Sequence, residues 1–199
     1  MLLCCSAVAV LCAPVYAAGL SEGERGRALS ELHASRKLFL DSLEGVSQTQ
    51  WNFKPNPQAW SVGECAEHIA LSEDMLFDLV TKKIMASPAD PSKRAEVKGK
   101  DEVVLKTIAD RSHKAQAPEM LQPKRTFASR EALIQHFRES RERLLEYVRT
   151  GQDDLRVHFA PHPAAGLLDG YQWILLLSAH TARHTAQIQE VKDSPGYPK

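Results

Sequence analysis

The sequence lacks an excess of charge of either sign, and it is poor in cysteine. Among its 199 residues, 25 Lys and Arg balance 25 Asp and Glu, and only 4 are Cys. A nucleic-acid-binding protein usually presents a basic face or tail to the phosphates, so balanced charge leads us to expect no nucleic-acid partner. Hydrophobic residues make up 43% of the chain, which fits one globular domain that buries its own core.

No hydrophobic run reaches the roughly 20 residues that a transmembrane helix needs, so we expect no stable membrane span. The apolar run from Leu2 to Ala13 ends near the small residues Ala17 and Ala18, a pattern typical of signal-peptidase cleavage. We therefore expect residues 1–17 to be a signal peptide, residues 18–199 to form the domain, and the protein to be exported, periplasmic or secreted. If the segment is not a signal, the protein is cytoplasmic; a lipoprotein signal at Cys12 and a buried N-terminal helix are the other interpretations.

Cleavage would remove three of the four cysteines, Cys4, Cys5 and Cys12, and leave Cys65 alone. One cysteine cannot form an internal disulfide, so a disulfide-stabilised scaffold is excluded. For Cys65 we favour a small buried thiol, with a nucleophile or a fourth metal ligand as the alternatives.

Strand-like alternation, internal repeats and βαβ units are missing from the sequence, and helical periodicity dominates. The pairs Ser21/Glu24 and Ser61/Glu64 have the spacing of capping boxes, which predict helix starts. Four amphipathic helices are predicted at about residues 21–43, 61–86, 129–150 and 169–192. Residues 51–60 and 153–168 are expected to be loops, and residues 87–127 a long connection with one short helix at about 101–112. The fold class is therefore all-α: a four-helix bundle with a long irregular connection between helices two and three.

His180 and His184 lie four residues apart in the fourth predicted helix and project from the same face, one turn apart. The face also carries Trp173, Leu177, Gln187 and Val191, and is expected to point into the bundle. Inward-facing imidazoles without a neutralising acid nearby in sequence are natural metal ligands. His68, near the inner face of the second helix, would complete a three-nitrogen site with positions open to water or substrate. In the alternative interpretation, His68 is half-buried, binds no metal and is hydrogen-bonded by Glu64 one turn earlier.

Two segments combine these histidines with a recognisable pattern: WSVGECAEHIA at residues 60–70, and residues 171–188 from YQWI through HTARHTAQI. Together with Pro161-His162-Pro163 and Gly166, their order and spacing resemble the DinB-like superfamily, the DinB and YfiT type metalloenzymes. The resemblance covers about residues 28–191 apart from 87–127. It implies a four-helix bundle, often a homodimer, with a divalent metal ion such as zinc or nickel held by three histidines. In this sequence those positions are His68, His180 and His184.

Members of that family with an assigned activity are thiol S-transferases or metal-dependent hydrolases acting on small molecules. Low-molecular-weight thiols are chiefly cytosolic in the family, and this chain is expected to be exported. We therefore expect a metal-dependent hydrolase that uses water on the three-histidine site, with an unidentified small-molecule substrate. A thiol S-transferase and a non-catalytic metal- or ligand-binding bundle are the alternatives. Glu64 is the candidate catalytic residue, as a base or as an orienting partner of His68.

Other residues near the histidines receive structural interpretations. Glu67 is expected to be solvated, Arg183 to pair with an acid on a neighbouring helix, and Gln187 to hydrogen-bond near the site. Trp60 and Trp173 are expected in the core or the pocket wall. We expect four of the remaining histidines at the surface: His33, His113, His136 and His158. His162 is expected to be a solvated loop residue, with the mouth of the pocket as the alternative.

Overall fold

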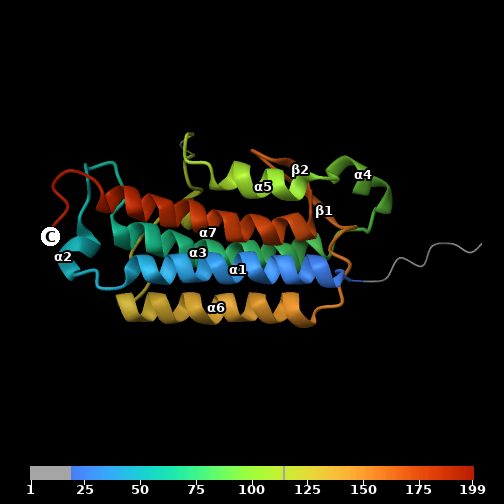
Figure 1. Cartoon of the computed structure of the whole chain (residues 1–199), viewed down its shortest axis with the longest axis horizontal. Helices are drawn as coiled ribbons and strands as arrows, with labels where there is room; N and C mark the ends of the chain where they lie inside the picture. The colour runs from blue at the N-terminus through green and yellow to red at the C-terminus, as the bar shows by residue number, and fades with distance from the viewer. Residues whose placement is uncertain (1–18, 114) are drawn as a thin grey trace, which may run out of the picture.

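Four long helices form the body of the protein. The computed structural model describes residues 19–113 and 115–199, so the predicted signal peptide lies outside the described residues. The long helices are α1 (Glu22–Leu43), α3 (Val62–Asp78), α6 (Arg130–Thr150) and α7 (Gly170–Lys192). They run side by side, and α6 and α7 each pack against both α1 and α3 (Figure 1). The predicted all-α four-helix bundle is thus confirmed.

The shorter elements lie in the connections. Residues 44–61 contain α2 (Gln48–Asn52), and α3 continues into a π-helical segment, η1 (Leu79–Ile84). The long connection holds η2 (Pro91–Lys93), α4 (Arg94–Val97), α5 (Lys100–Ala109) and η3 (Glu119–Leu121). Helix α5 packs on α7 outside the four-helix body (Figure 1). A two-stranded antiparallel hairpin, β1 (Phe159–His162) and β2 (Gly166–Asp169), precedes α7.

Two predicted loops were therefore partly wrong. Strands of four residues are too short to show a convincing alternation, which is why the β1–β2 hairpin was missed. Its turn returns through Gly166 at φ +70°, a conformation that glycine adopts without strain. Helix α2 includes Trp51 and Asn52 and begins at a capping box formed by Ser47 and Gln50.

Capping explains where the long helices begin. The side chains of Ser21 and Ser61 accept hydrogen bonds from the N–H groups of Glu24 and Glu64, so both predicted capping boxes are confirmed. At α7, Asp169 and Gln172 form a third box. Each cap satisfies N–H groups that have no partner within the helix.

The core consists of two apolar clusters separated by a buried polar layer. One cluster contains Leu32, Leu144 and Ile174, and the other contains Phe39, Phe137 and Ile188. Between them lie four polar residues, one from each helix of the bundle: Ser35, Glu73, Arg141 and Thr181.

Arg141 is the centre of this layer. Its side chain and that of Glu73 are both 0% exposed, and Arg141 Nη2 donates to Glu73 Oε2 at 2.9 Å and to Thr181 Oγ1 at 3.0 Å. Removing one member of such a pair leaves a buried charge without a partner, which typically costs about 3–5 kcal/mol. The layer thus fixes how the four helices are aligned along the bundle. It does so next to His180, which directly precedes Thr181 in α7.

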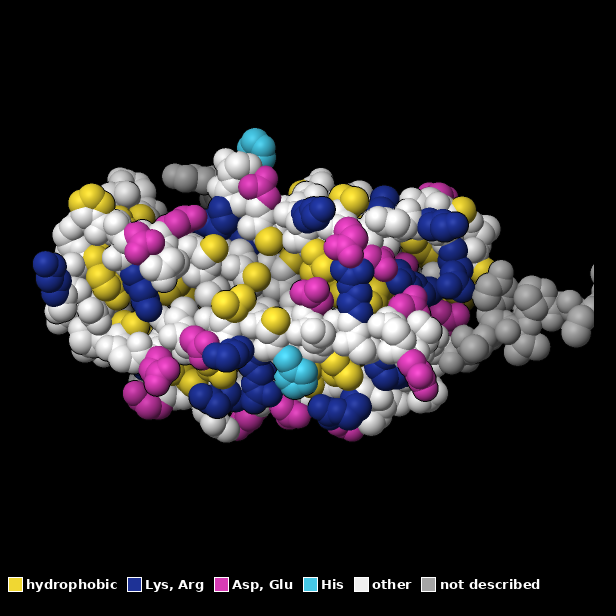
Figure 2. All heavy atoms as spheres, in the orientation of Figure 1, with side chains coloured by type: hydrophobic (Ala, Val, Ile, Leu, Met, Phe, Trp, Pro, Cys, Tyr) yellow, Lys and Arg dark blue, Asp and Glu magenta, His cyan; other side chains and the backbone are white. Residues whose placement is uncertain are grey.

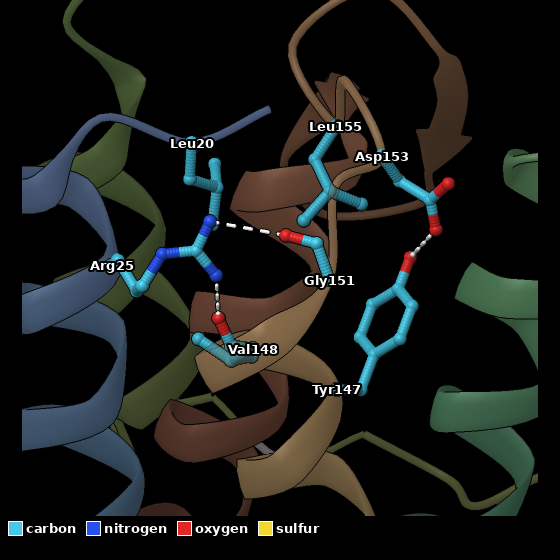
Figure 3. A pocket seen from close by; sticks show the side chains of 7 residues that line it. All are labelled: Leu20, Arg25, Tyr147, Val148, Gly151, Asp153 and Leu155. Atoms are coloured by element: carbon cyan, nitrogen blue, oxygen red, sulfur yellow. Dashed lines mark hydrogen bonds between the residues drawn. The ribbon is translucent and has the colours of Figure 1, made fainter. Parts of the chain in front are cut away.

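The end of the bundle where α6 stops is closed by Arg25 of α1. Its guanidinium donates to the carbonyls of Val148 and Gly151, the second at 3.0 Å (Figure 3). Beside it, Tyr147 donates to Asp153 at 2.8 Å (Figure 3). Carbonyls at the end of a helix lack partners within it, so Arg25 caps α6 from a neighbouring helix.

The face of the molecule shown in Figure 2 mixes both signs of charge. On the face shown in Figure 2, which α1, α5 and α6 dominate, Lys and Arg side chains alternate with Asp and Glu. Within the described residues, the helices are all too short or too polar to cross a membrane.

Candidate metal centre

Three histidines converge between α3 and α7. One ring nitrogen from each of His68, His180 and His184 lies within 4.8 Å of the others. His68 Nε2 and His184 Nε2 are 3.2 Å apart. The ring of His180 lies 5.1 Å from that of His68 and 4.5 Å from that of His184, measured between centroids. The structure therefore brings together the three residues that the sequence selected.

The hydrogen bonds of two rings determine which nitrogen carries the proton. His68 Nδ1 lies 2.8 Å from the carbonyl oxygen of Leu121. His184 Nδ1 lies 2.8 Å from Oε1 of Gln187. Both partners are oxygens that only accept, so each Nδ1 must donate, and in the neutral ring each Nε2 then carries a lone pair.

Burial keeps the three imidazoles neutral. It lowers the pKa of His68, and it lowers the pKa of His180 well below the usual value, with further lowering from the other two rings. Burial and the neighbouring His68 lower the pKa of His184 to about 3. A cluster of neutral nitrogens is the form in which histidine binds metals.

The arrangement fits a metal ion. Two lone pairs that face each other across 3.2 Å repel unless a cation lies between them. Two imidazole nitrogens that bind one ion at about 2.0–2.1 Å stand roughly 3 Å apart, close to the separation seen here. His68 and His184 therefore have the donor type, the proton position and the spacing of two ligands to one divalent ion, and a nitrogen of His180 lies within 4.8 Å of both.

An aromatic wall and a buried thiol border the cluster. The ring of Trp60 lies 4.9 Å from that of His68 and 6.2 Å from that of His184, so Trp60 packs directly beside the cluster. Cys65 is 0% exposed, and burial raises the pKa of its thiol. This matches the small buried thiol favoured from the sequence, because a neutral buried thiol is a poor nucleophile.

Glu64, the candidate base, lies at the start of α3. Its Oε2 accepts from the N–H of Ser61 at 2.8 Å, and Lys54 forms an ion pair with the carboxylate at 3.0 Å. The side chain is 33% exposed. These contacts give Glu64 a capping role, and its part in catalysis stays a prediction.

Glu67 is buried, so the expectation that it is solvated was wrong. The residue is only 6% exposed, and its carboxylate accepts from the N–H groups of Lys124, Arg125 and Thr126 at 3.0, 3.1 and 2.7 Å. Burial acts to raise the pKa of Glu67, but these N–H groups outweigh it and lower the pKa. Glu67 thereby anchors the long connection next to η3, which supplies the carbonyl that orients His68.

Arg183 does not pair with an acidic side chain of a neighbouring helix as its main contact. It donates instead to backbone carbonyls at the end of α5, those of Ile108, Asp110 and His113, the last at 2.6 Å. The sequence could not reveal this contact because backbone carbonyls carry no residue-specific signal.

The other histidines do not join the three-histidine cluster, although His162 lies near enough to lower the pKa of His180. His162 belongs to β1, where its ring contacts Trp173 at 5.4 Å and its Nδ1 accepts from the N–H of Ala164 at 3.1 Å. His136 pairs with Asp74. His33 and His113 are exposed, and His158 Nδ1 contacts the carbonyl of Ser87 at 2.8 Å.

Sequence reasoning missed Arg111 and the carbonyl of Leu121. Arg111 Nη1 lies 3.3 Å from Gln187 Oε1, the atom that holds His184. Both missed groups belong to residues 87–127, where periodicity is weak. Gln187 was expected near the site, and the structure places it there.

The sequence profile of the DinB superfamily matches residues 31–188, a span that contains all three histidines. The chain belongs to the DinB superfamily. This DinB superfamily protein is 28% identical over 165 residues to the uncharacterized protein YuaE of Bacillus subtilis strain 168, which covers 83% of this chain and 97% of YuaE.

The fold of this DinB superfamily protein is similar to a solved structure of YfiT from Bacillus subtilis. The TM-score is 0.54 at 16% identity, over 90% of this chain and 92% of YfiT. YfiT is described as a probable metal-dependent hydrolase with an unusual four-helix bundle topology. At this level of identity the likeness concerns the fold.

Proposed function

We propose that this protein is a metal-dependent hydrolase whose divalent ion is held by His68, His180 and His184. The observation that carries the proposal is the 3.2 Å separation of His68 Nε2 and His184 Nε2, each with its proton on the other ring nitrogen. The description of YfiT, whose fold is similar, supports hydrolysis as the reaction class.

Each residue of the site has a defined task in this proposal. His68, His180 and His184 would hold a divalent ion, which would supply Lewis acidity and could bring the pKa of water at the site to about 7. Leu121 and Gln187 orient two of the three rings through their Nδ1 protons. Trp60, whose ring lies 4.9 Å from that of His68, would cover one side of the cluster.

Glu64 is proposed as the proton acceptor, and it can be tested apart from its capping role. The variant Glu64→Gln retains an oxygen that can accept from the N–H of Ser61, so the start of α3 should persist. A loss of activity in this variant would then report the carboxylate charge rather than the helix.

Two alternatives use the same three ligands. In a thiol S-transferase the ion would hold a small thiol as the nucleophile, and in a binding protein it would hold a ligand without turnover. Export of the chain, if residues 1–17 are a signal peptide, favours the hydrolase because small thiol cosubstrates are chiefly cytosolic in the family.

The proposal is tested with protein purified without chelator and assayed with ester, amide and thiol-conjugation substrates. We expect hydrolysis that disappears after metal removal and returns with zinc or nickel. His180→Ala and His184→Ala should lower it by more than about 100-fold, since losing even an outer hydrogen-bond partner costs about 10–100-fold. His33→Ala, an exposed residue on α1, is the control.

The assay also separates the alternatives. Turnover confined to the thiol substrates would replace the hydrolase by the transferase. Stoichiometric metal with no turnover in the panel would favour the binding protein, and hydrolysis that persists in the metal-free protein would contradict the proposed site.

A further inference from the structure

A side chain from outside the four-helix body is linked to one of the proposed ligands through a single residue. Arg111 follows α5, in the segment that packs on the outside of α7 (Figure 1). Its guanidinium reaches two residues of α7 that lie one turn apart, Gln187 and Glu190. Because Gln187 contacts His184, Arg111 is one hydrogen bond removed from a proposed metal ligand.

Glu190 fixes the orientation of the guanidinium. Arg111 Nε and Nη2 donate to its two carboxylate oxygens at 2.8 and 2.6 Å. This fork-to-fork geometry leaves little rotational freedom. The remaining nitrogen, Nη1, is thereby directed at Gln187 Oε1, 3.3 Å away, and the Arg111 side chain is only 20% exposed.

The direction of the Gln187 amide decides the tautomer of His184. A guanidinium has donors and no acceptor, so only the oxygen end of the amide can face Arg111 favourably. The same oxygen lies 2.8 Å from His184 Nδ1. It can only accept there, so Nδ1 must carry the proton and Nε2 is left free to bind a metal ion.

The opposite amide orientation would disable the ligand. The NH₂ group of Gln187 would then face the donors of Arg111 and would donate to His184 Nδ1. The ring proton would move to Nε2, the atom that lies 3.2 Å from His68 Nε2. A protonated nitrogen cannot bind the ion.

We infer that Arg111 is a positioning residue that orients Gln187 and so keeps Nε2 of His184 available to the metal. His68 needs no orienting residue of this kind, because its partner is the carbonyl oxygen of Leu121, which can only accept a hydrogen bond. Both controlling groups come from the long connection. The bundle brings the three ligands together, and the connection selects the tautomers of His68 and His184. This inference rests on the proposed metal site.

The test compares metal affinity in Arg111→Met, Gln187→Leu and the double variant Arg111→Met with Gln187→Glu, by titration of metal-free protein with Co²⁺. Each single variant should weaken binding by about tenfold, the lower end of the effect of losing such a partner. The double variant should recover the affinity, because a carboxylate has no donor end and accepts from Nδ1 without being oriented.

An NMR signal gives a readout independent of activity. In the Co²⁺-loaded protein the Nδ1 proton of His184 should appear as a strongly shifted, exchangeable resonance. In Gln187→Leu it should exchange with water faster, because its acceptor is gone. Arg27→Met is the control: Arg27 of α1 pairs with Glu102 of α5 and so also ties the connection to the bundle, and its loss should leave the affinity unchanged.

The outcomes distinguish this inference from the proposed function. If the unmodified protein binds no Co²⁺, the metal site itself fails. If it binds Co²⁺ and Arg111→Met binds equally well, Arg111 does not position the ligand. If Arg111→Met is impaired and the double variant is equally impaired, Arg111 acts only as a tether between α5 and α7, and the inference is overturned.

Discussion

Among single residues, two glycines in helices have opposite surroundings. Gly63 lies in the first turn of α3, where a Cβ would stand 2.3 Å from Nε1 of Trp51. Gly26 lies in α1, where a Cβ would meet nothing within 4 Å. Gly63 is therefore needed for the close approach of α2 to α3, whereas Gly26 only adds backbone freedom to the unfolded chain.

Substituting alanine at these two positions should have effects of opposite sign. Gly63→Ala should lower the free energy of unfolding by about 1–3 kcal/mol, because Trp51 must move. Gly26→Ala should raise it by about 0.5–1 kcal/mol, since alanine is the better helix former. Urea unfolding measures both, and equal effects of the two substitutions would contradict the close contact.

Single residues also show where sequence reasoning succeeds. Helical spacing places His180 and His184 on one face of a helix, and the addition of His68 and the family resemblance led to the three-histidine site. Glu67 has a similar sequence context to exposed glutamates, and only the arrangement of the distant amides at residues 124–126 explains its burial. A partner 57 to 59 residues away leaves no local pattern.

Among the elements, the long connection does more than link α3 to α6. It supplies Arg111, the Leu121 carbonyl and the amides bound by Glu67. Near the first turn of α5, Arg156 from the loop after α6 joins three elements. It forms ion pairs with Glu24 of α1, Asp101 of α5 and Asp169 at the start of α7, at 2.8 to 2.9 Å. The connection is thus fixed to the bundle at both ends of α5.

The Arg156 junction predicts a pH-dependent contribution to stability. Burial acts to raise the pKa of Asp101, but hydrogen bonds from Arg156 and Gln172 outweigh it and lower the pKa below its usual 3.8. A lowered folded-state pKa means that the contribution is complete above the unfolded-state pKa. It is lost as the pH falls through the folded-state value.

Asp101→Asn should therefore lower the free energy of unfolding by about 1–3 kcal/mol at pH 7. The difference from the unmodified protein should shrink below about pH 4. Asp78→Asn, which breaks an exposed pair with Lys82, is the control and should change little. A difference for Asp101→Asn that is constant from pH 7 to pH 3, measured by thermal unfolding, would contradict this account.

For the whole molecule, the four-helix architecture followed from amphipathic periodicity and capping boxes, because both are local properties of the chain. The hairpin before α7 and the packing of α5 on α7 did not follow, since each depends on contacts between short segments with weak patterns of their own. The polar layer around Arg141 was likewise hidden, because a helix-borne arginine looks solvent-exposed in sequence.

The central claim for the whole molecule is that the bundle presents three histidines to one divalent ion. X-ray absorption of the zinc-loaded protein tests it most directly, with His33→Ala as the matched control for His180→Ala. We predict three imidazole nitrogens at about 2.0–2.1 Å from zinc in the unmodified protein and in His33→Ala, and fewer in His180→Ala. A spectrum without imidazole ligands, or one that is the same in His180→Ala as in the unmodified protein, would contradict the claim.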